Sequence, residues 1–139
     1  MIVLDTNVLS ELIRPEPHQG VIEWVAQFQS SSLFTSAVTQ AELLYGLELL
    51  PEGKRRSLLE AGAEEMFGRV FLGRILPFDS DAARFFAMIG ASRRKSGRPM
   101  SQPDCQIAAI TRSRGASLAT RNIRDFEDCG IPIVNPWQS

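Results

Sequence analysis

Short apolar runs alternate along this chain with longer segments in which apolar residues recur every three or four positions. The short runs predict strands at residues 2–4, 33–35, 74–78, 117–120 and 131–134. The periodic segments predict helices at residues 8–13, 21–28 and 54–71, a helix carrying Leu43 to Leu50, and two more at about 80–96 and 101–115. This alternation predicts an α/β fold with a central, mostly parallel β-sheet flanked by helices on both faces, in a single domain of residues 1–139.

Acidic residues stand close to the predicted strand ends. Asp5 directly follows the first strand, Asp125 follows a late strand, and Glu42 and Asp104 are expected in the first turns of two helices. Ligands of parallel sheets bind beyond the carboxyl ends of the strands, so we expect these four carboxylates to converge there. Four such charges repel one another unless a hard cation such as Mg²⁺ neutralises them. The sequence therefore predicts a metal site suited to phosphodiester hydrolysis.

A purely structural interpretation of two of these acids stays open. Thr39-x-x-Glu42 and Ser101-x-x-Asp104 both match capping boxes, in which an acid in the first turn stabilises the helix without any catalytic role. Asp5 is different, because an unpartnered carboxylate entering the core from an apolar strand costs several kcal/mol in desolvation. A functional role is therefore the better interpretation for Asp5.

Composition narrows the classes of function. Hydrophobic residues make up 44% of the chain and the net charge is −1, so no overall basic field attracts nucleic acid. The two cysteines, Cys105 and Cys129, lack the spacing of a zinc site, and the single histidine, His18, has no second soft ligand nearby. No membrane-spanning run or secretory signal is recognisable, and we expect a cytoplasmic protein.

At these acids the chain resembles the PIN-domain family, and within it the VapC and FitB toxins of type II toxin–antitoxin pairs. The resemblance covers nearly the whole length and rests on an ordered set of motifs. These are IVLDTNVLSEL, SAVTQAELLYGL, LPFDSDAA, PDCQIAAIT, LATRNIRDF and the terminal NPW. Any one of them is weak evidence, but an accidental match to all of them in order is improbable.

The resemblance implies a PIN fold and endonucleolytic cleavage of RNA. It implies that Asp5, Glu42 and Asp104 hold Mg²⁺, for which Mn²⁺ can substitute, with Glu42 binding directly or through water. The supporting residues implied around these ligands are Thr6, Asn7 and Thr120. It further implies a homodimer and a small VapB-like antitoxin that occupies the acidic groove.

The fourth acid is assigned to Asp125, directly on the metal or through water. Many members of the family have aspartate where this chain has Asn122, which can orient a ligand but adds no charge. Asn122 is therefore expected to make a supporting contact. Beside it, Arg121 and Arg124 are candidates for contacts to RNA phosphates, although exposed arginines are common on protein surfaces.

Other residues have alternative interpretations as well. The basic cluster of Arg93, Arg94, Lys95 and Arg98 could guide RNA but is more simply a solvated helix end. Trp137 could stack on a base but is expected to pack the chain terminus against the core.

Two functions compete with a metal-dependent ribonuclease. A catalytically degenerate PIN domain could act as an RNA- or protein-binding module, and Asn122 in an often acidic position motivates this alternative. An aspartyl phosphatase is disfavoured, because Asp5-Thr6-Asn7 lacks the second aspartate that haloacid dehalogenase-type enzymes place two residues later. The RNA target and the number of metal ions are not encoded in any short motif.

Overall fold

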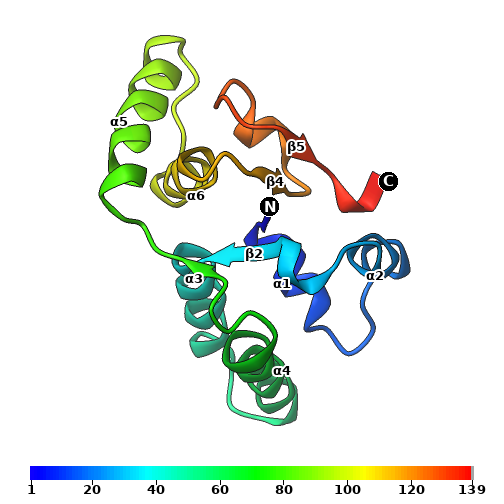
Figure 1. The fold of residues 1–139 in the computed structure, drawn as a ribbon. Helices are drawn as coiled ribbons and strands as arrows, with labels where there is room; N and C mark the ends of the chain where they lie inside the picture. Colours follow the sequence, from blue (N-terminus) through cyan, green and yellow to red (C-terminus); the bar gives the residue numbers. More distant parts are fainter. Residues whose placement is uncertain (139) are drawn as a thin grey trace.

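A fully parallel five-stranded sheet organises the computed structural model, which describes residues 1–138 (Figure 1). The strand order is β3-β2-β1-β4-β5, and every pairing between neighbours is parallel. The strands are β1 (Ile2–Leu4), β2 (Leu33–Ser36), β3 (Ile75–Leu76), β4 (Ser117–Ala119) and β5 (Ile133–Val134). All five predicted strands are confirmed, and the first of them lies at the centre of the sheet.

Helices connect the strands as crossovers, which a parallel sheet requires. They are α1 (Thr6–Leu12), α2 (Gln19–Ala26), α3 (Ala37–Glu48), α4 (Lys54–Glu65), α5 (Ser80–Lys95) and α6 (Gln102–Ser113). A π-turn, η2 (Met66–Val70), extends α4, and three short 3₁₀ segments are η1 (Ser30–Ser32), η3 (Ile123–Phe126) and η4 (Pro136–Gln138). No helix within residues 1–138 combines the length and apolar character needed to cross a bilayer.

Two apolar cores lie on opposite faces of the sheet. Successive side chains of a strand point to opposite faces, so Val3 joins one core and its neighbour Leu4 joins the other. The core around Val3 takes its other residues largely from α5 and α6, which lie together in Figure 1. The core around Leu4 takes its residues largely from α1 to α4 and η2, and it includes Trp24, as the helical spacing predicted. The predicted coverage of both faces is thus confirmed.

The position of Glu42 in the third helix was predicted incorrectly. The sequence allows Ser36 or Thr39 as the N-cap, and Ser36 is the one that caps α3, since its hydroxyl accepts the Thr39 backbone N–H at 3.0 Å. Glu42 consequently lies in the second turn of α3, and the expected capping box with Thr39 does not form. The helix begins at Ala37 because the strand before it ends in its own capping serine. A role in capping the helix therefore does not explain Glu42.

Arg93 is not part of a solvated helix end, as the run of basic residues suggested. It is buried on α5, with 5% exposure, and its guanidinium donates to three backbone carbonyls. These acceptors are the oxygens of Arg98 at 2.8 Å, Asp125 at 3.2 Å and Glu127 at 2.8 Å. The side chain therefore ties the end of α5 to the η3 loop that carries Asp125.

Replacing Arg93 by methionine should destabilise the protein by about 2–4 kcal/mol, because buried carbonyls lose their charged donor. The exposed neighbour Arg94 provides a matched control, and Arg94→Met should change stability by less than about 0.5 kcal/mol. Urea-induced unfolding of the two variants measures both values. Equal stability of the two variants would show that the Arg93 contacts do not hold the loop.

Candidate active site

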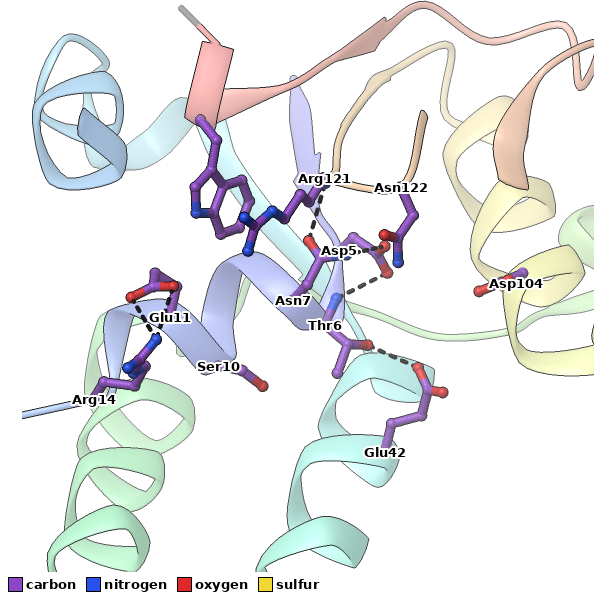
Figure 2. A pocket seen from close by; sticks show the side chains of 11 residues that line it. Asp5, Thr6, Asn7, Ser10, Glu11, Arg14, Glu42, Asp104, Arg121 and Asn122 are labelled. Carbon is purple, nitrogen blue, oxygen red and sulfur yellow. Dashed lines mark hydrogen bonds and ion pairs between the residues drawn. The ribbon is translucent and has the colours of Figure 1, made fainter. Parts of the chain in front are cut away.

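The carboxylate of Asp5 is the most enclosed acid of the site. It lies at the carboxyl end of the central strand, is 4% exposed, and is the N-cap of α1. Its Oδ1 accepts the Thr6 backbone N–H at 2.8 Å, and its Oδ2 accepts the Thr120 hydroxyl at 2.7 Å. The Asn7 amide also donates to Oδ2, at 3.3 Å (Figure 2). These donors fix the direction of both oxygens.

Burial makes the negative charge of Asp5 costly. Desolvation raises its pKa to about 6, although the Thr120 hydroxyl and the Thr6 N–H oppose this shift. The nearby charges of Asp104 and Glu42 raise the pKa further. Three acids that repel one another electrostatically therefore lie at one end of the sheet, and the charge of the central one is poorly solvated.

Glu42 and Asp104 reach the site from two different helices. Glu42 projects from α3, and its Oε1 accepts the Thr6 hydroxyl at 2.7 Å. Asp104 projects from the first turn of α6, where Ser101 caps the helix as predicted. Partial burial raises the pKa of Asp104, and the charges of Asp125 and Glu42 add to the increase. Asp5, Glu42 and Asp104 line one cavity of about 440 Å³ (Figure 2).

Asp125 lies beside this cavity, not in its wall. It stands exposed on η3 and lines a neighbouring hollow of about 340 Å³ together with Arg124. Asn122 and Arg121 border both spaces. The charge of Asp125 nevertheless raises the pKa of Asp104, so the two carboxylates interact electrostatically. The predicted fourth acid is thus near the others but more peripheral.

The supporting residues named from the sequence form one hydrogen-bonded network around Asp5. The Asn7 amide donates to Thr120 Oγ1 at 3.3 Å, and the Asn122 backbone N–H donates to the same oxygen at 3.1 Å. The Arg121 backbone N–H donates to Asn7 Oδ1 at 3.2 Å. Hydrogen bonds from α1 and from the segment after β4 thereby hold the Asp5 carboxylate in place.

The donor set fits a hard divalent cation, although the acids do not form a closed cage. Within residues 1–138, no three Asp, Glu, His or Cys side chains stand close enough together to hold a metal ion. Glu42 is turned toward Thr6, and Asp104 stands on a separate helix across the cavity. Magnesium commonly uses one or two carboxylates and keeps several waters, so an open site suits it. The desolvated charge of Asp5 is what such an ion would stabilise.

Sequence reasoning missed three residues of the cavity wall. Ser10 and Glu11 lie on α1 where it runs along the cavity, and Arg14 comes just after the end of that helix. Glu11 is buried, and it accepts the His18 backbone N–H at 3.0 Å and faces Arg14 at 3.4 Å. The spacing of Asn7, Ser10, Glu11 and Arg14 along one face of a helix is the signal that could have identified them.

Neither cysteine takes part in the site. Cys105 and Cys129 are buried free thiols, and burial raises the pKa of each. A thiol with a raised pKa is a poor nucleophile at neutral pH. Cys105 packs among core residues although it adjoins Asp104 in sequence.

Comparison with known proteins identifies the family. The sequence model of the PIN-domain family matches residues 2–131. The chain belongs to the PIN-domain family. It is 42% identical to the VapC ribonuclease Y4jK of Sinorhizobium fredii and 36% identical to the toxin FitB of Neisseria gonorrhoeae, with 99% of both chains covered in each comparison. The crystal structure of FitAcB from Neisseria gonorrhoeae superimposes with a TM-score of 0.91 at 36% identity, covering 100% of both chains. The expected PIN fold is therefore confirmed.

Removing the buried charge of this PIN domain should stabilise it when divalent ions are absent. The pKa of Asp5 lies near 6 in the folded state and near 3.8 when unfolded, so its contribution to stability falls as pH rises from about 4 to 6. Asp5→Asn should therefore be more stable than the wild type by up to about 3 kcal/mol at pH 7.5 in EDTA. Urea unfolding at pH 4.5 and 7.5 measures the effect. A stability difference that does not grow with pH would contradict the desolvation argument.

Proposed function

We propose that this PIN domain is a VapC-like endoribonuclease toxin of a type II toxin–antitoxin pair, which hydrolyses RNA phosphodiester bonds with a divalent metal ion. One observation carries the proposal: the desolvated Asp5 carboxylate shares a cavity with Glu42 and Asp104. The names of the relatives, a VapC ribonuclease and a toxin, support the same assignment.

The metal of this proposal is Mg²⁺, with Mn²⁺ as a substitute. Asp5 and Asp104 would be direct ligands, and Glu42 and Asp125 would bind directly or through water. When bound, such an ion polarises a phosphate oxygen and lowers the pKa of a coordinated water. Asp5 is suited to hold it because hydrogen bonds fix both of its oxygens.

The residues of the chain itself divide the remaining tasks. Thr6 holds Glu42 through Oε1, which leaves the second oxygen of Glu42 to accept a proton from the attacking water. Asn7, Thr120 and Asn122 keep Asp5 in place through their hydrogen-bond network. In the proposal Arg121 and Arg124 meet phosphates of the RNA.

The proposed partners follow from the relatives. FitB is called a toxin, and we extend to this chain a small VapB-like antitoxin that blocks the acidic cavity. We also propose that the chain forms a homodimer and acts in the cytoplasm.

A second candidate is a catalytically degenerate PIN domain that only binds RNA or protein. The peripheral position of Asp125 and the uncharged Asn122 favour it, because together they leave the cavity wall without a fourth carboxylate on that side. Metal binding separates the two candidates, since hydrolysis by this route requires a cation.

Purified protein should cut RNA in Mg²⁺ or Mn²⁺ and lose the activity in EDTA. Asp5→Asn and Asp104→Asn should each lower the single-turnover rate at least about 100-fold, because ligand loss removes several kcal/mol of charge stabilisation. Gel analysis of cleaved RNA measures the rate, with Asp81→Asn as an exposed control on α5. Cleavage that survives EDTA or both substitutions would refute the mechanism.

Asp125→Ala should lower the rate less than Asp104→Ala does, by about 10-fold, as expected for a residue that supports a ligand from outside the cavity. The same single-turnover assay compares the two variants. Equal losses would show that Asp125 is a metal ligand of equal importance.

A further inference from the structure

Arg121 lines the cavity that the acids share, but no acid among residues 1–138 forms an ion pair with it. The cavity wall contains a second guanidinium, that of Arg14, which faces Glu11 at 3.4 Å. Arg121 forms no ion pair with any acid within residues 1–138. Its side-chain contact is the ring of Trp137, whose centroid lies 5.1 Å from the guanidinium carbon. The positive charge of Arg121 is therefore available to an anion that enters the cavity.

Both members of this pair are held by their backbones. The Arg121 N–H donates to Asn7 Oδ1 at 3.2 Å, and Asn7 also donates to Asp5. The Trp137 N–H donates to Asn135 Oδ1 at 2.9 Å. The backbone of Arg121 is thus connected to the Asp5 carboxylate through the Asn7 side chain, as Figure 2 shows for Arg121, Asn7 and Asp5. The fold thereby places the backbone of Arg121 next to the acids, and the Trp137 ring is the contact that orients its guanidinium.

Stacking on the indole leaves the N–H edge of a guanidinium free to hydrogen-bond. A planar guanidinium over an aromatic face gains cation–π attraction, while its donors still point outward in the ring plane. Those donors match the paired oxygens of a phosphate. With a net charge of −1, the chain has no general field for a polyanion, so RNA must be held locally.

We propose that Arg121, oriented by Trp137, is the subsite that binds an RNA phosphate beside the one that is cut. This inference rests on the proposed ribonuclease function. Arg121 contacts the substrate, whereas Trp137 is a positioning residue that acts through Arg121. The competing ligand is an acidic peptide segment of a protein partner, which would bind the same charge. If that is the ligand instead, Arg121→Ala leaves the affinity for RNA unchanged.

The test measures the affinity for a short single-stranded oligoribonucleotide. An Asp104→Asn background in Mg²⁺ suppresses cleavage, and a gel run after the titration verifies that the RNA is intact. Adding Arg121→Ala should weaken binding about tenfold, the loss expected for a charge-assisted hydrogen bond. It should also reduce the slope of log affinity against log salt by about 0.7. Arg84→Ala, which removes an exposed arginine from α5, should leave the affinity unchanged.

The positioning role of Trp137 has its own readouts. Trp137→Ala should weaken binding about three-fold in the Arg121 protein and have no further effect after Arg121→Ala, because the ring acts only through the guanidinium. The chain has two tryptophans, and Trp24 is buried in the core with 4% exposure. RNA should therefore change the tryptophan fluorescence of the Asp104→Asn protein, and Trp137→Phe should abolish that change.

Affinity of the Arg121→Ala protein within twofold of its parent would overturn the subsite, as would additive effects of the Arg121 and Trp137 substitutions. Urea unfolding of each variant separates lost binding from lost structure. Cleavage by the wild-type protein is assayed separately, so the two proposals can fail independently. If the wild type cuts RNA while Arg121→Ala binds normally, only the subsite is wrong.

Discussion

The carboxylate of Asp5 is buried at the carboxyl end of the central strand, and the architecture of the site depends on that placement. Every strand runs in the same direction, so the ends of β1, β2 and β4 come together on one edge. The edge receives one acid from the strand and two from neighbouring helices. Burial raises the pKa of Asp5 to about 6, so its charge is unfavourable in the protein alone. A cation that relieves this cost would link the fold to the proposed chemistry.

The surrounding hydrogen bonds hold the carboxylates in place without neutralising their charges. Thr6 and Thr120 donate to Asp5 and lower its pKa, but desolvation is the larger effect. Thr6 also holds Glu42 through its hydroxyl. A single turn after β1 thus positions two acids through its backbone and its side chains. The last loop completes the arrangement, since Thr120 and Asn122 approach from β4.

Much of this arrangement could be predicted from the sequence because it follows from local patterns. The strand before Asp5 and the cap at Ser101 are encoded within a few residues, and the alternation of elements predicts the parallel sheet. The acids of the cavity follow from their places after strands or on helices. Residues whose role depends on distant partners were harder to predict. Arg93 belongs to a basic run, yet it is buried and donates to backbone carbonyls in and next to η3.

The remaining differences have the same physical origin. Trp137 packs against the core around Leu4, as expected, but it also contacts Arg121 in the cavity wall. Asp125 is close enough to affect Asp104 but faces a separate hollow. Neither fact is visible in spacing along the chain, because the first depends on how η4 packs beside Arg121 and the second on how η3 packs beside α6.

Calorimetric titration of Mg²⁺ into the purified protein at pH 7.5 tests most directly whether the acids around Asp5 form a metal site. The wild-type protein should bind the ion with a defined stoichiometry, and Asp5→Asn should not bind it measurably. Equal binding by the two proteins, or no binding by the wild type, would contradict the account.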